Sequence, residues 1–218
     1  MKMWAHVGRA AAMKVVYGSP PDWNEMRAWE RLLQPDELFI DVGANVGTYA
    51  LWAAHLGCRV VAIEPDAETC RLLVENVALN PGARIAVRRT ALTDHIGSVR
   101  MTTGLDSMNH LGDGPEVPAT TLDAVIGDQD VAGVKIDVEG FEELVMVGAH
   151  EPLLSRRVRA FQLEWNDFSV GRMGTDRSGI ERMLTDAGYV LLRPDMEGAL
   201  RATRTAFGPD IFALRCGS

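Results

Sequence analysis

The sequence predicts a doubly wound α/β fold, in which helices cover both faces of a mostly parallel sheet. Apolar runs alternate with segments of helical spacing along most of the chain. The first apolar run leads through a glycine turn, Gly43-Ala44-Asn45-Val46-Gly47, into a helical segment, and the next apolar run ends in Glu64. The order of strand, glycine turn, helix, strand and acid is typical of the nucleoside-binding half of such folds.

The leading helix is predicted over residues 22–33, because Trp23, Met26, Trp29 and Leu33 lie on one stripe. Asp22 is a candidate N-cap for this helix. Short apolar runs then predict strands, and amphipathic segments predict helices. In chain order these are strand Leu38–Val42, helix Thr48–Leu56, strand Arg59–Ile63, helix Ala67–Leu79 and strand Arg84–Arg88.

The second half of the chain starts less regularly. Ser98–Thr103 alternates apolar and polar residues, as a short extra strand would, and Gly104–Pro118 is rich in turn-forming residues, which predicts a loop. The later elements are helix Leu122–Ile126, strand Gly133–Ile136, helix Phe141–Gly148, strand Val158–Leu163, helix Gly179–Ala187, and strands Tyr189–Arg193 and Asp210–Leu214. Because no helix separates the last two strands, we expect an antiparallel hairpin at the edge of a seven-stranded sheet.

Composition limits the class of protein and its partners. A length of 218 residues suits one domain, in which residues 1–36 form a helical segment that packs on the domain of residues 37–218. The net charge of −8 argues against nucleic acid as a partner, and no apolar run approaches the ~20 residues of a membrane span. Three cysteines without C-x-x-C spacing indicate a reducing, cytoplasmic setting, and apolar residues near the N-terminus suggest a homodimer.

The glycine turn favours one kind of nucleoside ligand. Asn45 replaces the middle glycine of the dinucleotide fingerprint, and no glycine follows in the third place, so a pyrophosphate would fit poorly. Asp41, at the end of the first strand, suits a cation better than an anion. S-adenosylmethionine carries an amino group and a sulfonium but no phosphate, and it is therefore the expected cofactor.

Four predicted strands end in acids, which are Asp41, Glu64, Asp137 and Glu164. Ligands of open α/β sheets bind at these carboxyl ends. Crowded carboxylates repel one another unless a cation joins them. One expected cation is the sulfonium near Asp41, and another is Mg²⁺ near Asp137, Glu164 and Asn166, whose oxygens suit a hard metal ion.

Methyl transfer requires a positioned nucleophile and a place for its proton. An aliphatic alcohol needs a general base or a Lewis-acid metal, whereas an amine needs only to be uncharged. His110 lies in the glycine-containing loop 107–112 and is a candidate base. A loop histidine that bonds the backbone or the cofactor is an equally good interpretation.

In these residues the chain resembles the FkbM family of S-adenosylmethionine-dependent methyltransferases. Three segments carry the resemblance: Phe39–Gly47 with Ala62–Pro65, Thr120–Asp123, and Val134–Glu142 followed by Gly148-Ala149 and Glu164. The resemblance implies a Rossmann-like class I methyltransferase fold. It also implies a small-molecule substrate and methylation of a hydroxyl, often on a sugar, a polyketide or another specialised metabolite.

The resemblance further implies roles for individual residues. The cofactor site would consist of Asp41, Gly43, Asn45, Gly47, Thr48, Glu64, Pro65, Thr93, Asp94 and Asp137. In it the glycine turn lines the methionine end, Glu64 holds the ribose, and Thr93 and Asp94 flank the adenine. Asp137 and Glu139 occupy the acidic signature and join His110 as candidate catalytic residues, although Glu139 could instead bond backbone N–H groups at the next helix start. The Mg²⁺ site follows a looser likeness to catechol-type O-methyltransferases.

The sequence thus favours an O-methyltransferase for a small molecule, assisted by a base or by Mg²⁺. One alternative is an N-methyltransferase, which would need no metal. Another is a nicotinamide-dependent oxidoreductase, against which Asn45 and the absence of a Tyr-x-x-x-Lys pattern count. A non-catalytic binding module is the third alternative, and it has no use for so many carboxylates at one edge of a sheet.

Overall fold

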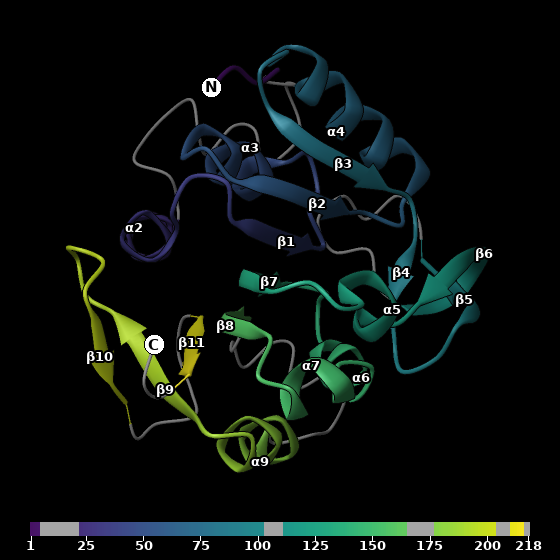
Figure 1. The fold of residues 1–218 in the computed structure, drawn as a ribbon. Coiled ribbons are helices and arrows are strands. Elements are labelled where there is room, and N and C mark those ends of the chain that lie inside the picture. The colour runs from purple at the N-terminus through teal and green to yellow at the C-terminus, as the bar shows by residue number, and fades with distance from the viewer. Residues whose placement is uncertain (5–21, 103–110, 165–176, 204–209, 216–218) are drawn as a thin grey trace.

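The computed structural model describes residues 1–4, 22–102, 111–164, 177–203 and 210–215. Within these ranges the strands form one sheet of eight strands and one of three (Figure 1). The order of the large sheet is β10-β9-β11-β8-β7-β1-β2-β3. The predicted fold class, α/β with a mostly parallel sheet and antiparallel C-terminal strands, is confirmed.

The parallel part of the large sheet contains the five strands predicted for it. They are β1 (Leu38–Val42), β2 (Arg59–Ile63), β3 (Arg84–Arg88), β7 (Val131–Ile136) and β8 (Val158–Leu163). From β1 the chain runs outward to β2 and β3 and returns to β7 on the other side of β1. This reversal places a topological switch point between the carboxyl ends of β1 and β7, where open α/β sheets bind ligands.

The C-terminal strands are antiparallel, as the sequence predicts. β11 (Ile211–Arg215) lies between β8 and β9 (Tyr189–Pro194) and runs antiparallel to both. All seven predicted strands are present, and a short eighth strand, β10 (Leu200–Ala202), pairs with β9 and forms the edge. Three residues are too few to show an alternating pattern, so the sequence did not predict β10.

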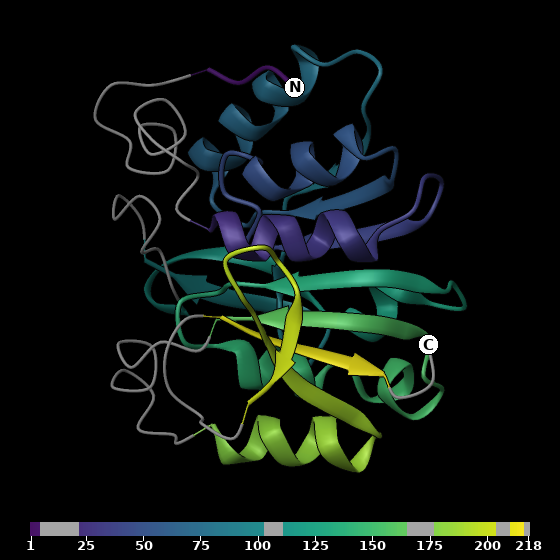
Figure 2. The same ribbon diagram turned by 90° about the vertical axis from the view of Figure 1, so that its left-hand side faces the viewer.

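Helices cover both faces of the large sheet (Figures 1 and 2). One face carries α2 (Trp23–Leu32), α3 (Thr48–His55) and α4 (Ala67–Ala78); the other carries α5 (Leu122–Ile126), α6 (Glu142–Val147), α7 (His150–Leu154) and α9 (Ser178–Asp186). Phe39 of β1 packs toward the first group, whereas Ile40 and Val42 pack toward the second. Because strand side chains alternate, Asp41 faces α2 and α3. None of the described helices has the length and apolar character needed to cross a bilayer.

Trp29 attaches α2 directly to the large sheet. Its ring centre lies 5.0 Å from that of Phe39 and 5.1 Å from that of Phe212. The indole also covers Gly133 of β7, where a Cβ atom would lie only 2.4 Å from the ring. The helix predicted over residues 22–33 is confirmed, and the missing side chain at Gly133 is what lets it approach the strand.

The small sheet contains β4 (Ala91–Leu92), β5 (Gly97–Met101) and β6 (Leu111–Thr120), in the order β4-β6-β5. β5 confirms the extra strand predicted near residues 98–103. The loop predicted over residues 104–118 is wrong for residues 111–118, which belong to β6, while residues 103–110 lie outside the described ranges. Pairing with β5, including a register shift between Arg100 and Met101, accommodates the glycines and prolines of β6.

Candidate active site

The glycine turn joins β1 to α3 at the carboxyl end of the strand, as the sequence predicts. Gly43 has a φ of 76°, and a Cβ atom there would lie 1.9 Å from the backbone oxygen of Asp137. Glycine is therefore required where β1 passes the end of β7. Asn45 also adopts a left-handed conformation, with a φ of 50°, and Thr48 begins α3 directly after Gly47. The turn thus places its backbone beside Asp137.

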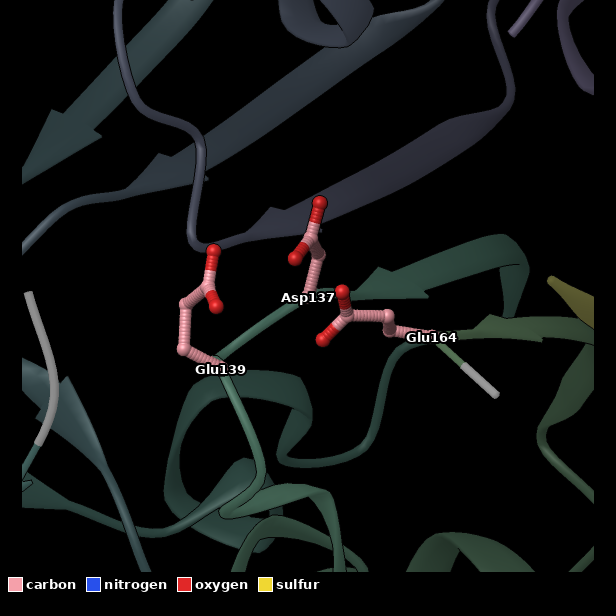
Figure 3. A group of neighbouring side chains, drawn as sticks. All are labelled: Asp137, Glu139 and Glu164. Carbon is pink, nitrogen blue, oxygen red and sulfur yellow. The ribbon is translucent and has the colours of Figure 1, made fainter. Parts of the chain in front are cut away.

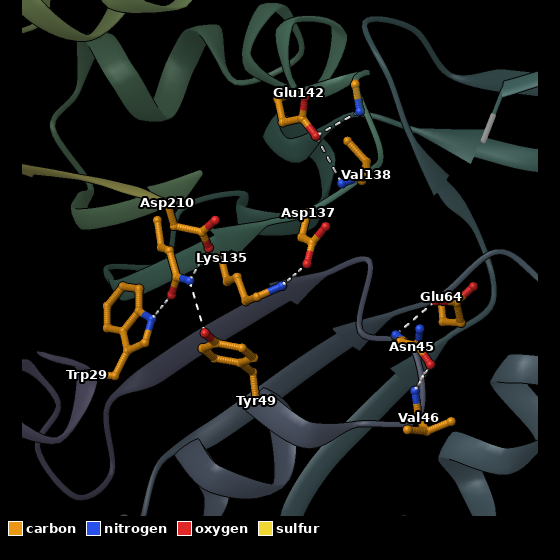
Figure 4. A network of polar contacts seen from close by, with 12 residues as sticks. Trp29, Asn45, Val46, Tyr49, Glu64, Lys135, Asp137, Val138, Glu142 and Asp210 are labelled. Atoms are coloured by element: carbon orange, nitrogen blue, oxygen red, sulfur yellow. Dashed lines mark hydrogen bonds and ion pairs between the residues drawn. The ribbon is translucent and has the colours of Figure 1, made fainter. Parts of the chain in front are cut away.

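Glu64, at the end of β2, holds the glycine turn (Figure 4). Its Oε2 accepts a hydrogen bond from the Asn45 N–H at 2.9 Å, and its Oε1 accepts one from the Asp66 N–H at 3.0 Å. Burial raises the pKa of Glu64 to about 7, although both backbone hydrogen bonds act to lower it. A carboxylate oxygen can accept two hydrogen bonds, so each oxygen retains capacity for a ligand hydroxyl.

Asp41 is the most deeply buried acid at this edge of the sheet, with 1% of its surface exposed. In the described part of the chain, neither of its carboxylate oxygens has a hydrogen-bond partner of full geometry, and the Ala50 backbone N–H makes a weaker contact that acts to lower the pKa of this carboxyl. Burial raises the pKa of Asp41 to about 6, while Lys135 lowers it and Asp137 raises it further. A buried carboxylate without a full hydrogen bond is costly, and a cationic ligand is one group that would relieve this cost.

Lys135 is a buried cation that the sequence reasoning missed. Its Nζ donates a hydrogen bond to Asp137 Oδ2 at 2.8 Å and lies 4.7 Å from the centre of the Tyr49 ring. Burial acts to lower the pKa of Lys135, but Asp137, Asp41 and Asp210 outweigh it and raise this pKa above its usual value. A lysine inside the otherwise apolar run 131–136 is the signal that could have revealed it.

Beside Lys135, a separate hydrogen-bond network joins Tyr49 and Asp210 through Gln162 to α2 (Figure 4). The Trp29 indole N–H donates to Gln162 Oε1, and Gln162 Nε2 donates to Tyr49 Oη at 3.2 Å and to Asp210 Oδ2 at 2.6 Å. The indole contact fixes which end of the Gln162 amide faces Asp210. Burial, followed by the charge of Asp137, raises the pKa of Asp210 to about 7. Asp210 is thus a fifth acid at this edge of the sheet, and the sequence reasoning missed it.

The ends of β7 and β8 bring three further acids together (Figure 3). Asp137, Glu139 and Glu164 are partly buried, and one carboxylate oxygen from each lies within 4.8 Å of the others. The structure therefore joins Asp137 and Glu164, as the metal-site prediction requires, and adds Glu139. His110 and Asn166, the candidate base and the third predicted metal ligand, lie outside the described residues.

Glu142 secures the turn that carries Glu139. Its Oε1 accepts hydrogen bonds from the Val138 N–H at 3.2 Å and the Gly140 N–H at 3.1 Å. Its Oε2 pairs with Arg177 Nη1 at 2.5 Å, and both side chains are buried. Glu142 thus bonds backbone N–H groups of this turn on both sides of Glu139. Glu139 itself has a φ of 56° and joins the acid cluster.

The remaining predicted cofactor residues lie near the small sheet. Pro65 lines a pocket of about 240 Å³ together with the start of α4, Arg89 and parts of β5 and β6. Thr93 is buried, and its Oγ1 accepts a hydrogen bond from the His95 N–H at 3.1 Å. Asp94 Oδ1 lies 2.8 Å from His95 Nδ1, a contact that lowers the pKa of Asp94. The described side-chain contacts of Thr93 and Asp94 are therefore local, whereas the Thr93 backbone N–H donates to the Thr120 carbonyl of β6 at 2.9 Å.

Curated proteins that match the chain include two transferases. The hexuronic acid methyltransferase AglP of Haloferax volcanii is 26% identical over 162 residues, which cover 71% of this chain and 64% of AglP. The tRNA(Phe) (4-demethylwyosine(37)-C(7)) aminocarboxypropyltransferase of Pyrococcus horikoshii is 40% identical over 63 residues, which cover 28% of this chain and 23% of that protein. The chain thus spans less than two thirds of the length of either relative.

Solved structures share the fold. Precorrin-6y C5,15-methyltransferase from Geobacter metallireducens matches with a TM-score of 0.54 at 14% identity over 91% of both chains. Magnesium protoporphyrin IX methyltransferase (ChlM) from Synechocystis with bound SAM matches with a TM-score of 0.51 at 16% identity, over 88% of this chain and 77% of that one. The sequence profile of the "Methyltransferase FkbM domain" matches residues 41–191, more than half of the chain. The protein therefore belongs to the FkbM methyltransferase family.

Proposed function

We propose that the protein is an S-adenosylmethionine-dependent O-methyltransferase that acts on a hydroxyl group of a small molecule. The observation that carries the proposal is Asp41, a buried carboxylate beside the glycine turn that has no hydrogen bond of full geometry from the described residues and only a weaker contact with the Ala50 backbone N–H. Such a group fits the amino group or the sulfonium of S-adenosylmethionine, and it would repel a pyrophosphate. Family membership supports the same cofactor.

The predicted cofactor residues divide among the parts of this molecule. Glu64 would accept hydrogen bonds from the ribose hydroxyls in addition to those from Asn45 and Asp66. The methionine end would lie against Asp41, Gly43, Asn45, Gly47, Thr48 and Asp137. The pocket beside Pro65 has room for part of the adenine, and Thr93 and Asp94 would flank it.

The acid cluster of Asp137, Glu139 and Glu164 would serve the acceptor. In methyl transfer the acceptor oxygen bonds to the methyl carbon, the carbon–sulfur bond breaks with its electrons on sulfur, and the hydroxyl proton leaves to a base. A carboxylate of the cluster, or His110, would receive that proton. Lys135 donates a hydrogen bond to one carboxylate oxygen of Asp137, so the other oxygen would serve the acid cluster.

We include Mg²⁺ in the proposal because the donor set suits it. Carboxylate oxygens within 4.8 Å of one another match the oxygen ligands that hard cations take. Asp137 and Glu164 would hold the ion, with Asn166 as a further ligand. When bound, the ion would supply a Lewis acid that makes an alcohol easier to deprotonate.

A sugar-like acceptor is the class that the relatives favour. AglP is named for hexuronic acid methylation and shares the longer match. The net charge of −8 supports a small molecule over nucleic acid, although the shorter relative is named for tRNA. We also propose a cytoplasmic location and a homodimer. Cys58 and Cys70 are free thiols in the structure, which suits a reducing compartment.

Calorimetric titration with S-adenosylhomocysteine, with and without Mg²⁺, tests the proposed cofactor. We expect binding of S-adenosylhomocysteine and none of NAD⁺, and a stronger interaction with Mg²⁺ would support the ion. Formation of S-adenosylhomocysteine from S-adenosylmethionine and glucuronic acid then tests a sugar-like acceptor. Binding of NAD⁺ in place of S-adenosylhomocysteine would overturn the proposed function.

A further inference from the structure

Three polar side chains lie next to one another in the middle of the large sheet. Asp41 of β1 is the register partner of Lys135 of β7, and Lys135 is the partner of Gln162 of β8. Register partners in a sheet point to the same face, so all three face α2 and α3. The residues before and after Lys135, Val134 and Ile136, are fully buried and apolar. The only charged residue inside β7 is therefore placed beside Asp41.

Lys135 is surrounded by more negative charge than it can neutralise. Asp41, Asp137 and Asp210 all act on its pKa, and only Asp137 receives its hydrogen bond. In turn, Lys135 is the cation that favours the ionised forms of Asp41 and Asp210. Three carboxylates and one ammonium leave the group negatively charged when all are ionised. Interactions among such buried charges are strong because little water screens them.

We propose that Lys135 is a positioning residue that fixes the Asp137 carboxylate and limits how strongly this acidic group prefers a sulfonium to an uncharged sulfur. The inference rests on the proposed function, because S-adenosylmethionine and S-adenosylhomocysteine differ by one methyl group and one positive charge. The ratio of the affinities for the two ligands therefore measures the effect of the charge of the site on the sulfonium.

The geometry explains how Lys135 both fixes the Asp137 carboxylate and reduces the negative charge of the site. Its side chain is 4% exposed, so it acts through Asp137, which is 38% exposed, and does not reach an acceptor itself. The Tyr49 ring on one side and the Asp137 oxygen on the other fix its ammonium. The ammonium thus holds Asp137 in place and reduces the net negative charge that the cofactor meets.

The test compares the affinities of S-adenosylmethionine and S-adenosylhomocysteine by calorimetry in three proteins: wild type, Lys135→Met and Asp210→Asn. Titrations are made at about pH 8.5, above the pKa values of Asp41 and Asp210, with EDTA present to exclude divalent ions. Lys135→Met should raise the preference for S-adenosylmethionine by roughly fivefold, because a positive charge is lost. Asp210→Asn should lower that preference, because a negative charge is lost and the shape is kept.

Opposite shifts from the two variants would support the inference, because loss of structure would change both affinities of a variant together. Unchanged ratios, or shifts in the same direction, would overturn it. If Lys135→Met does not fold, Lys135→Gln removes the same charge, and an unchanged ratio in that variant overturns the inference. Wild-type protein that binds neither ligand would instead contradict the proposed function. Lys135→Arg keeps the charge and should keep the wild-type ratio within about twofold.

Discussion

The proposed cofactor side and the proposed acceptor side of the site are built in different ways. The cofactor side, formed by the glycine turn and Glu64, comes from one stretch of chain, and its acids are buried against backbone N–H groups or apolar side chains. The acceptor side, formed by Asp137, Glu139 and Glu164, comes from the ends of two strands, and its acids are partly exposed. Local sequence therefore determines the first side, whereas strand pairing assembles the second.

The largest expected effect is on the rate of methyl transfer, and it distinguishes the acceptor side from the cofactor side. Asp137→Asn should reduce methyl transfer by about a thousandfold, because the neutral amide neither accepts the hydroxyl proton nor binds a cation well. The affinity for S-adenosylhomocysteine should change only a few-fold. Steady-state rates and calorimetry measure the two quantities. Asp128→Asn, the same change at a fully exposed acid paired with Arg157, is the matched control and should leave both near wild type.

Glu64→Gln should have the reverse effect. It removes a charged acceptor from the ribose site and weakens the bonds to Asn45 and Asp66, so S-adenosylhomocysteine should bind less tightly by roughly 1.5–3 kcal/mol. Calorimetry measures the loss. Glu68→Gln makes the same change on the exposed face of α4 and should bind normally. Normal binding by Glu64→Gln would remove Glu64 from the cofactor site.

The smallest expected effect is on the pH dependence of stability without ligand. The folded protein raises the pKa of Asp210 from 3.8 to about 7, so it binds more protons than the unfolded chain between these values. Stability from this group is full below the unfolded value and is lost as the pH rises through 7. Between about pH 5 and about pH 8 the loss should be on the order of 2–3 kcal/mol.

Denaturant unfolding of wild type and Asp210→Asn at about pH 5 and about pH 8 measures this contribution. The free energy of unfolding should fall less with rising pH in the variant than in wild type. Equal slopes in the two proteins would show that Asp210 does not titrate in this range. That result would indicate that water reaches the Asp210 carboxylate more readily than it reaches the acid cluster.

The glycine turn and the strand ends beside it could be predicted from the sequence because their signals are local. The positive φ at Gly43 and Asn45 and the apolar strand before Glu64 follow from adjacent residues, and the structure brings Asn45 and Glu64 into contact. The strands and most helices were also predicted from their periodicity. The exceptions are β4, β6, β10 and α7, where pairing or tertiary packing outweighs a weak local pattern.

The acceptor side shows what local signals leave out. Asp137 is held by Lys135, which strand register places between Asp41 and Gln162. Glu142, which secures the turn that carries Glu139, meets Arg177 across 35 residues of chain. A sequence shows the strands but not which residues they place side by side. Glu139 was named for its motif, yet the position of its carboxylate beside Glu164 depends on the order of β7 and β8.

The contact between Trp29 and Gly133 has a consequence for anyone who shortens or exchanges the start of this chain. A version trimmed to begin at residue 37 would lose the indole that orients Gln162, and with it the donor that Asp210 receives. It would also open the sheet to water above Gly133. The leading helix thus covers one face of the sheet, and a replacement that lacks the indole would change the surroundings of the Asp210 carboxylate without changing any predicted site residue.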